Sequence, residues 1–246
     1  MSFKERENAI LEFLRQNRKA TIEELCAHLF VSEPTMRRDL AALNSAGKIV
    51  RIYGGASYKS ELGENLPQEI REREQSDAKA AIGKKCLSLI NDGDTIMVDA
   101  SSTGLALLRA LGGVHSIVVV TNNAKAPLIL ADTKVKTFIA GGELAANAYA
   151  CIGNYAEDFI RSFNADVCFF SVRRLTRDGR LTDNAIAENS IRRTMMSRSR
   201  KSVLMLDSHK IGDACINTLC DISAVTHVVC EKDISGEFPQ YKEKFL

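Results

Sequence analysis

The chain has 246 residues, which is long enough for a small module beside a larger domain. Hydrophobic residues make up 45% and charged residues 26%, as in a globular protein, and the net charge of +2 does not by itself indicate a nucleic-acid partner. No apolar run approaches the roughly 20 residues of a membrane span, and the charged first residues lack the apolar segment of a signal peptide. We therefore expect a cytoplasmic protein without a membrane partner.

The seven cysteines are scattered and show no Cys-x-x-Cys spacing. Most lie in apolar surroundings, as Cys168 does before Phe169 and Phe170, which indicates buried, reduced thiols. The four histidines do not pair with cysteines at the spacing of metal ligands. The sequence therefore predicts no metal site and no cofactor.

Residues 1–59 have the pattern of three short helices followed by a hairpin. Ile10 and Leu14 repeat at helical spacing, and Thr21 followed by Glu24 is the signature of a capping box at the start of a second helix. Ten basic and seven acidic side chains give this stretch a local net charge of +3. Because that excess is small, the positions of the charges matter more than their sum.

A third helix is predicted over residues 32–46. Ser32 is a good N-cap, and Pro34 falls in the first turn, where a missing N–H costs nothing. Gly47 is expected to end the helix. Its buried stripe consists of Met36, Leu40 and Leu43.

A tight hairpin is predicted directly after this helix. A β-rich run over residues 49–53 is followed by Gly54 and Gly55 as the turn and by a second short run over residues 56–58. This hairpin has the form of a wing. Arg51 or Lys59 would reach the DNA backbone or the minor groove from it.

A helix, a tight turn and a second helix make the shape that enters the DNA major groove. Arginine suits a bidentate contact with guanine or a clamp on phosphate, and hydroxyls at a helix N-terminus can bind phosphate. The alternatives are a protein-docking module and an arginine pair that is only a solvated face. The candidate DNA-binding residues are Ser32, Glu33, Pro34, Thr35, Arg37, Arg38, Asn44, Arg51, Gly54 and Gly55.

Residues 60–76 are polar and charged, and we interpret them as a linker with partial helical character. From residue 77 onward, strand and helix patterns alternate, which predicts a mostly parallel sheet covered on both faces. The strand candidates are residues 95–99, 117–120, 136–139, 166–171, 202–206 and 227–230.

Small polar residues follow three of these strands, and ligands of open parallel sheets gather at the carboxyl ends of strands. Where such residues lead into a helix, free N–H groups and hydroxyls can bind a phosphate. The simpler alternatives are a helix cap for the serines and a chain corner for the glycines. The three groups are Asp99 with Ser101, Ser102, Thr103 and Gly104; Thr121 with Asn122 and Asn123; and Gly141 with Gly142.

The run from Ser32 to Leu40, centred on Thr-x-Arg-Arg-Asp-Leu, resembles the N-terminal signature of the DeoR-type bacterial transcription repressors, as do Gly47 and residues 51–56. Tyr53 stands where the family more often has histidine. The resemblance implies that Thr35, Arg37 and Arg38 are the principal operator contacts. For Asp39, we favour an ion pair that holds a neighbouring arginine over a base contact.

Residues 77–246 also resemble this family. Its C-terminal domain is similar in fold to ribose-5-phosphate isomerase and glucosamine-6-phosphate deaminase and typically binds a phosphorylated sugar or related metabolite. Lys210 occupies the family's Asp-Ser-Ser-Lys position and would supply a cation. Asp178, Asp183 and Glu188 match a stretch that lines the same cleft, although Asp183 alternatively only caps the next helix.

The chain departs from the family pattern at several positions of this domain. Arg174 stands in place of a glycine, and Arg173 precedes it, so these cations either fill part of the cleft or add a second anion contact. Asn189 replaces the second residue of a frequent Glu-Glu pair, and Asn123 replaces a commoner serine. Four arginines are expected to complement the C-terminal end of a helix and face solvent: Arg192, Arg193, Arg198 and Arg200.

We therefore predict an α/β protein with a winged helix-turn-helix over residues 1–59, a linker over 60–76 and a sensor and oligomerisation domain over 77–246. It would be a transcriptional regulator, by family habit a repressor of carbohydrate-metabolism genes, acting on operator DNA as a homodimer or homotetramer under control of a phosphorylated sugar. The sequence leaves the effector, the operator, the regulated genes and the sign of regulation undetermined.

The alternative is a sugar-phosphate isomerase on the same fold. Isomerisation needs a carboxylate base and a group that stabilises the enediolate. The related isomerases carry a Gly-Ala-Asp cluster where this chain has Arg173 and Arg174, so we expect no enzyme and no catalytic residue. A pure protein-docking scaffold is a third interpretation, because fold alone does not exclude it.

Overall fold

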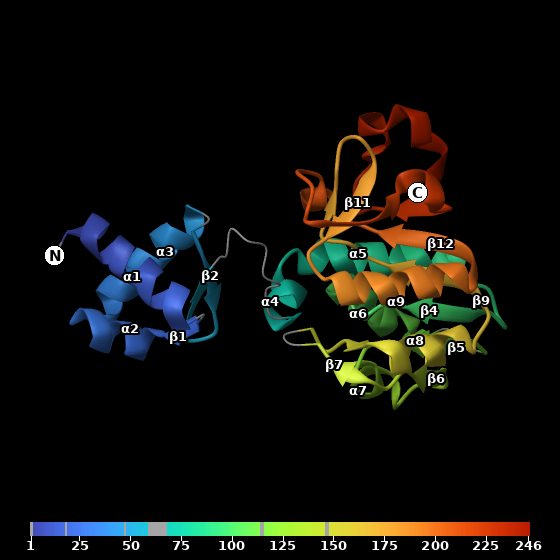
Figure 1. Ribbon diagram of the computed structural model, residues 1–246, viewed down its shortest axis with the longest axis horizontal. Coiled ribbons are helices and arrows are strands. Elements are labelled where there is room, and N and C mark those ends of the chain that lie inside the picture. The colour runs from blue at the N-terminus through green and yellow to red at the C-terminus, as the bar shows by residue number, and fades with distance from the viewer. Residues whose placement is uncertain (1, 18, 47, 59–67, 114–115, 146–147) are drawn as a thin grey trace. The chain divides into compact units, whose positions relative to one another are not determined.

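The computed structural model describes residues 2–17, 19–46, 48–58, 68–113, 116–145 and 148–246. The chain divides into two units, residues 1–66 and residues 67–246 (Figure 1). No helix among the described residues is long and apolar enough to cross a membrane.

The N-terminal unit is a winged helix-turn-helix, which confirms the predicted fold of this part. It contains helices α1 (Phe3–Asn17), α2 (Ile22–Leu29) and α3 (Glu33–Ser45) and strands β1 (Lys19–Thr21), β2 (Ile49–Ile52) and β3 (Gly55–Tyr58). The strands form an antiparallel sheet in the order β1-β3-β2. Its core is built from Ile10, Leu14, Leu25, Met36, Leu40, Leu43 and Ile49, all essentially inaccessible to solvent.

Local signals fix the ends of these helices. The capping box of α2 is present: the Glu24 N–H donates to the Thr21 hydroxyl at 3.1 Å, and the Thr21 N–H donates to the Glu24 carboxylate at 2.8 Å. Ser32 is the N-cap of α3, but its hydroxyl contacts the Thr35 hydroxyl at 3.0 Å and makes no capping hydrogen bond. Gly47, which was expected to end α3, lies outside the described residues.

The wing differs from its prediction by one residue. Ile52 pairs with Gly55, so the turn is Tyr53-Gly54, and Gly55 belongs to strand β3. Gly54 has φ +73°, a value that suits glycine. Gly55 is needed for a different reason: a Cβ there would lie 2.0 Å from the carbonyl oxygen of Ala20 on β1. The two glycines thus serve a turn and a close strand contact.

The second unit is built on a six-stranded sheet in the order β14-β12-β9-β4-β5-β6, in which every neighbouring pair is parallel. This confirms the predicted α/β class. The strands are β4 (Thr95–Val98), β5 (Val118–Thr121), β6 (Lys136–Ile139), β9 (Ala165–Phe170), β12 (Ser199–Met205) and β14 (His227–Val229).

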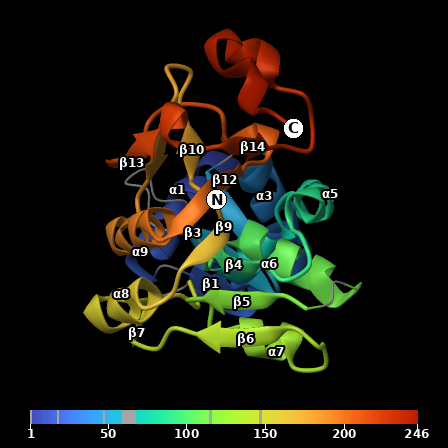
Figure 2. The ribbon, with the colours of Figure 1, turned by 90° about the vertical axis from the view of Figure 1, so that its right-hand side faces the viewer.

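Helices cover both faces of this sheet (Figure 2). On one face, α5 (Ser76–Cys86), α6 (Ser102–Ala110) and α7 (Ala126–Leu130) contribute to one buried apolar cluster. On the other face, α8 (Asn154–Arg161) and α9 (Ile186–Ser197) contribute to a second cluster. Burial on both faces explains why the strands read as continuous apolar runs.

Smaller elements surround the sheet. Strands β10 (Arg174–Leu175), β11 (Arg180–Asp183) and β13 (Asn217–Asp221) form an antiparallel sheet, and β7 (Glu143–Leu144) pairs with β8 (Cys151–Ile152). Short 3₁₀ turns occupy Leu87–Leu89, Leu111–Gly113, Ser208–Lys210, Ile222–Ala224, Ser235–Glu237 and Pro239–Lys244.

The strand order places a binding edge at one point of the sheet. From β4 the chain proceeds to β5 and β6 on one side, whereas β9, β12 and β14 lie on the other side. The connections that leave the carboxyl ends of β4 and β9 therefore diverge. Such a switch point is where open α/β sheets bind ligands.

The segment before α5 was predicted to be a linker through residue 76, and the structure assigns part of it differently. Residues 68–73 form helix α4, and the second unit begins at residue 67. Helix α4 contacts α6 (Figure 1). A six-residue polar helix is too short to show an apolar period in the sequence. Contacts with the rest of the unit stabilise it instead of local sequence preferences.

Candidate DNA-reading helix and effector site

The two arginines of helix α3 differ in whether their guanidinium groups are already paired. The Arg37 guanidinium bonds the Glu33 carboxylate one turn earlier, with Nε 2.9 Å from Oε1, and both side chains are exposed. Arg38 is exposed, and no partner for its guanidinium is found among the described residues. Thr35 is half-buried beside Ser32, and Pro34 lies in the first turn as predicted. Arg38 is thus the arginine of the pair that stands ready for a new contact.

Asp39 makes the ion pair that was favoured for it, but with a partner distant in the sequence. Its carboxylate accepts bonds from Nε (2.6 Å) and Nη2 (3.1 Å) of Arg6 on α1. This hydrogen bond raises the pKa of the Arg6 guanidinium. Asp39 is buried and therefore fixes α3 against α1, leaving Arg37 and Arg38 outside the pair.

The remaining predicted DNA-binding residues shape the wing. The Asn44 amide oxygen accepts the Arg51 N–H at 3.2 Å, which ties the end of α3 to β2. Arg51 is exposed on that strand. The sequence analysis did not single out two aromatic side chains that are almost fully exposed near α3: Phe30, 94% exposed in the turn before the helix, and Tyr53, 92% exposed at the tip of the wing. Their exposure depends on the fold and has no signal in the sequence.

At the carboxyl edge of the sheet, Arg192 of α9 is the centre of a buried ionic cluster. Its guanidinium bonds Asp99 (2.9 Å) and Asp183 (2.9 Å), lies 3.3 Å from Glu188, and also bonds the Asn189 amide oxygen (2.7 Å). The expectation that Arg192 faces solvent is therefore wrong. The Glu188–Arg192 spacing of four residues on one helix was the available signal.

Burial and pairing shift the titration of this cluster. Burial opposes the charged form of Arg192, but Asp183, Asp99 and Glu188 outweigh it and raise the pKa of the guanidinium. Burial raises the pKa of Glu188. For Asp183, burial is outweighed by Arg192 and by the Asn184 and Ala185 N–H groups, which lower the pKa. Asp183 thus holds the Asn184 and Ala185 N–H groups just before α9 and joins the cluster, whereas the N-cap of α9 is Ala185.

Lys210 stands beside this cluster at the ends of β9 and β12. Its amino group donates to the Ser171 hydroxyl at 2.8 Å and lies 3.7 Å from the Asp207 carboxylate. The Ser171 N–H in turn reaches Asp99 at 3.3 Å. Burial lowers the pKa of Lys210. The structure thus places Lys210 next to Asp99, as the sequence analysis predicted.

The loop from β4 into α6 is fully buried. The Ser101 hydroxyl donates to Asp99 at 2.5 Å and accepts the Gly104 N–H at 2.9 Å, so Ser101 acts as the helix cap. A Cβ on Gly104 would lie 2.6 Å from the Asp99 carbonyl oxygen, which explains glycine there. Ser102 and Thr103 form the first turn of α6. Ser101 and Gly104 therefore have structural roles that leave Thr103 as the polar side chain to explain.

Several buried polar atoms at this edge have no hydrogen-bond partner among the described residues. They are the Thr103 hydroxyl, the Asn122 amide oxygen and the Asn123 amide nitrogen. The other amide atoms of the two asparagines are used: Asn122 donates to the Cys151 carbonyl at 3.0 Å, and Asn123 accepts the Lys125 N–H at 2.9 Å. The Thr121 hydroxyl is fully used between Val98 and the Asn123 N–H.

Other predicted effector residues lie apart or have local roles. Asp178 is exposed in the turn of the β10–β11 hairpin, where it bonds Thr176 and Arg180, at the end of that hairpin opposite Asp183. Asp178 and Gly179 (φ +93°) form the turn, which gives Asp178 a local role, and its assignment to the effector site stays a prediction. Gly141 and Gly142 are exposed at the corner between β6 and β7.

The two arginines of the 171–175 segment point to different uses. Arg174 donates from Nη1 to the His209 carbonyl at 3.0 Å and so holds the loop that carries Lys210. The Arg173 N–H donates to Asp183 at 3.1 Å, and its half-buried guanidinium has no partner among the described residues. Arg173 is thus available to an anion.

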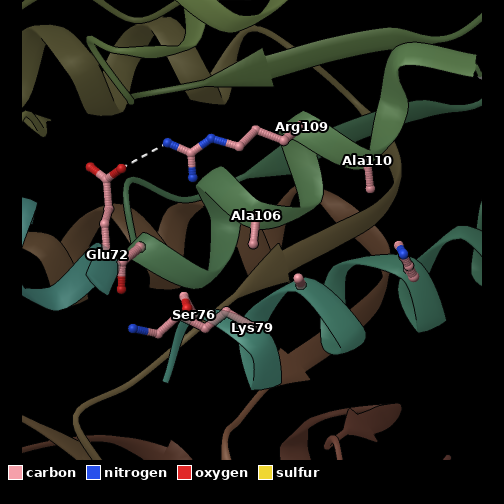
Figure 3. A pocket seen from close by; sticks show the side chains of 9 residues that line it. Glu72, Ser76, Lys79, Ala106, Arg109 and Ala110 are labelled. Atoms are coloured by element: carbon pink, nitrogen blue, oxygen red, sulfur yellow. Dashed lines mark hydrogen bonds and ion pairs between the residues drawn. The ribbon is translucent and has the colours of Figure 1, made fainter. Parts of the chain in front are cut away.

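A pocket of about 230 Å³ opens between α4, α5 and α6 (Figure 3). Glu72 of α4 and Arg109 of α6 form an ion pair of 2.7 Å at this pocket. Ser102, at the start of α6, is also part of its wall. The pocket therefore borders the predicted effector loop from the side of α4.

A winged helix-turn-helix joined to a parallel α/β unit with a polar carboxyl edge defines a DNA-binding transcriptional regulator with a separate sensor domain. The comparisons assign its family: the model of the DeoR-like helix-turn-helix domain matches residues 6–61, and that of the DeoR C-terminal sensor domain matches residues 74–232. The chain therefore belongs to the DeoR family of transcriptional regulators.

Named relatives agree with this assignment. The HTH-type transcriptional regulator GolR of Listeria innocua is 35% identical over 215 residues, which cover 85% of this chain and 82% of the relative. The glycerol-3-phosphate regulon repressor of Escherichia coli is 31% identical over 225 residues, 91% of this chain and 89% of the relative. These relatives support the regulator and not the isomerase-like alternative.

Solved structures match more weakly. Ribose 5-phosphate isomerase A from Methanocaldococcus jannaschii aligns with a TM-score of 0.43 and 13% identity. The alignment covers 56% of this chain and 55% of that chain.

Proposed function

We propose that this protein is a cytoplasmic transcriptional repressor whose operator affinity is set by a phosphorylated sugar or a related metabolite. Helix α3 and the wing read the operator, and the effector binds at the carboxyl edge around Asp99, Lys210 and the start of α6. One relative is named as the repressor of the glycerol-3-phosphate regulon, and glycerol 3-phosphate is a phosphorylated metabolite. A homodimer or homotetramer would present two reading helices to repeated half-sites.

The observation that carries the effector proposal is the set of unpartnered polar atoms on Thr103, Asn122 and Asn123. A buried polar group without a hydrogen bond costs free energy, and proteins rarely retain several in one place without a use for them. They follow two neighbouring strands, β4 and β5, whose carboxyl ends meet at the same edge. Hydroxyl groups of a sugar are suitable partners for all three.

The phosphate of the effector has its own partners nearby. The first N–H groups of α6, a nine-residue helix, are not all bonded within the helix, and its dipole favours an anion. Lys210 and the unpartnered Arg173 guanidinium supply positive charge at the same edge. Repression then ends only if the effector binds the DNA-free state more tightly than the DNA-bound state.

The DNA proposal is tested with the full chain. Selection from a random duplex pool would give the operator, and fluorescence anisotropy would give its Kd at several salt concentrations. We expect Arg38→Ala to weaken binding by about tenfold or more and to reduce the salt slope by about one. Arg200→Ala, which removes an exposed arginine of the sensor unit, is the matched control. Unchanged affinity and salt slope in both Arg37→Ala and Arg38→Ala would refute DNA reading by α3.

The effector proposal is tested by thermal unfolding of the full chain with glycerol 3-phosphate, ribose 5-phosphate, glucosamine 6-phosphate and fructose 1-phosphate. Each is compared with its unphosphorylated parent. At least one phosphate ester should raise Tm, and Lys210→Met should abolish the rise, whereas Lys134→Met on the exposed surface should not. No stabilisation by any of the four esters contradicts the proposal.

A further inference from the structure

Helix α4 docks on the sensor unit in an unusual way. Short helices usually dock through apolar side chains, but the one fully buried side chain among the described residues of α4 is the polar Gln68. Its Nε2 donates to the Ala100 carbonyl at 3.2 Å, and its Oε1 has no hydrogen-bond partner in the described part of the chain. Exchanging the two amide atoms does not help, because the amide oxygen would then face the Ala100 carbonyl oxygen, and two acceptors cannot hydrogen-bond each other.

Gln68 reaches the same edge of the sheet as the unpartnered atoms described above. Its partner Ala100 follows β4 and lies one residue before the loop into α6. Ala100 packs with Ala148 and Ala150, and Ala150 forms an isolated bridge with Asn123. Thr103, Asn122, Asn123 and Gln68 therefore come from segments that meet around one small alanine cluster.

Ionic contacts hold α4 in this position. The Glu72 carboxylate bonds Lys125 at 2.7 Å and Arg109 at 2.7 Å. From α5, the Lys79 amino group donates to the carbonyls of Arg71 and Glu74 at the end of α4. Burial raises the pKa of Glu72, but the hydrogen bonds from Lys125 and Arg109 lower it by more, so the pKa lies below its usual value. Glu72 is thus an anion that binds α4 to two cations of the sensor unit.

The unmet amide oxygen of Gln68 raises the question of why glutamine stands at this buried position. Replacing Gln68 by methionine would remove the unmet amide oxygen but also the Nε2 bond to the Ala100 carbonyl, so the stability of the free protein accounts for the amide nitrogen and gives no reason for the amide oxygen. A ligand that hydrogen-bonds the spare atom gives such a reason.

We propose that Gln68 is a specificity-determining residue of the effector site, whose spare amide oxygen accepts a hydrogen bond from a hydroxyl group of a phosphorylated polyhydroxy compound. This inference rests on the proposed function, because it assigns a further contact to the same effector. Helix α4 is then one wall of that site. The pocket on the Glu72 side of α4 gives the helix room to adjust when the compound binds (Figure 3).

The test uses Gln68→Met in the full chain, because methionine matches the length of glutamine but offers no strong hydrogen bond. Arg73→Met, at an exposed position of the same helix, is the matched control. Calorimetric titration gives the Kd for the phosphate ester that stabilises the wild type most, and for inorganic phosphate. We expect Gln68→Met to weaken the ester about tenfold, to leave inorganic phosphate unchanged and, because it loses only the bond to Ala100, to keep Tm within about 5 °C of the wild type.

The outcomes separate this inference from the proposed function. If an ester binds the wild type and binds Gln68→Met equally well, Gln68 does not contact the effector, and the proposed function stands. If Gln68→Met weakens the ester and inorganic phosphate equally, or lowers Tm by more than about 5 °C, Gln68 has only a structural role. If no ester binds the wild type, the proposed function fails and this inference fails with it.

Discussion

Arg192 is the buried cation that pairs with the carboxylates at the carboxyl edge of the sheet. Three buried carboxylates from three segments converge on it: Asp99 after β4, Asp183 at the end of β11 and Glu188 on α9. Charges this deeply buried persist only when they are paired, so the arginine decides whether the carboxylates can stay ionised. The same carboxylates help to hold Ser171, Ser101 and Arg173 through N–H contacts.

We predict that Arg192→Met destabilises the sensor unit by about 3–5 kcal/mol at pH 7.5, because it leaves buried carboxylates without their cation. In the variant, the carboxyl pKa values lie above their unfolded values. The penalty is therefore present at neutral pH and shrinks as pH falls through those raised values, so the loss should be smaller at pH 5.5.

Urea unfolding followed by circular dichroism checks this prediction. Arg193→Met is the control, because Arg193 is the exposed neighbour on α9 and bonds only the Thr218 carbonyl among the described residues. It should cost less than about 1 kcal/mol. Equal losses in the two variants, or a loss at pH 5.5 as large as at pH 7.5, would contradict the ionic role of Arg192.

At the residue level, the sequence predicted which residues lie at the carboxyl edge better than it predicted which side chains they bond. Asp99, which was singled out by its place after a strand, does lie together with Asp183, Glu188 and Lys210, which the family resemblance indicated. Arg192 was wrongly expected to face solvent, because the sequence does not distinguish it from the three other arginines within nine residues. Only the packing of α9 separates its buried face from its exposed one. For Asp178, an Asp-Gly pair fits a turn as well as a binding site, and the structure shows the turn.

Among the elements, the wing depends on two glycines with different physical reasons. Gly54 has φ +73° with open space around its Cα, whereas Gly55 faces the Ala20 carbonyl of β1. We predict that Gly54→Ala costs about 1 kcal/mol through backbone strain alone. Gly55→Ala should cost about 3 kcal/mol or more, because β1 and β3 must separate to admit the new Cβ.

The measurement is thermal unfolding of the N-terminal unit within the full chain, together with operator affinity. Gly55→Ala should weaken operator binding as well, since the wing is displaced, and Gly54→Ala should leave it near the wild type. A Gly55→Ala protein as stable as Gly54→Ala would show that β1 does not approach β3 this closely.

The contact between α4 and α5 predicts a pH dependence. Burial, together with repulsion by Lys210, lowers the pKa of Lys79 to about 8. Between pH 8 and the unfolded value near 10.5, the folded chain has lost a proton that the unfolded chain still binds, so the contribution of Lys79 to stability rises with pH. Below pH 8 this gain is absent.

The free energy of unfolding of wild type minus that of Lys79→Met should therefore increase between pH 7.5 and 10, by at most about 3 kcal/mol. Lys84→Met, at an exposed position of α5, should give a difference that does not change with pH. A flat difference for Lys79→Met as well would mean that Lys79 titrates as an ordinary lysine.

Elements with strong local signals were predicted well, and α4 was not. The capping box at Thr21, the cap and proline of α3, and the six parallel strands all follow from short-range patterns. Helix α4 depends on contacts of Glu72 with Lys125 and Arg109, residues that lie 53 and 37 positions further along the chain. No local pattern records such contacts, so the sequence indicated a polar linker with partial helical character but not the bounds of this helix.

For the whole molecule, α4 has a position that suits signal transfer. It is the first described element of the sensor unit, and the chain from the wing leads into it through residues 59–67. Its residues reach the effector edge through Gln68 and the sensor body through Glu72. Under the proposed regulation, an effector that displaces α4 would therefore act on the first described element after the connection to the DNA-binding unit.

The proposed regulation makes a reciprocal prediction. If the most stabilising phosphate ester weakens operator binding of the full chain by some factor, the operator must weaken binding of the ester by the same factor, which we expect between about 5 and 150. Glu72→Gln removes the charge that ties α4 to Lys125 and Arg109, so it should reduce this factor at least threefold. Glu237→Gln, which affects a peripheral pair with Arg177, should leave it unchanged. Anisotropy titrations measure the effect of the ester on operator affinity, and calorimetric titrations measure the effect of the operator on ester affinity. Unequal factors would refute a linkage equilibrium. An unchanged factor in Glu72→Gln would exclude these ion pairs from the coupling.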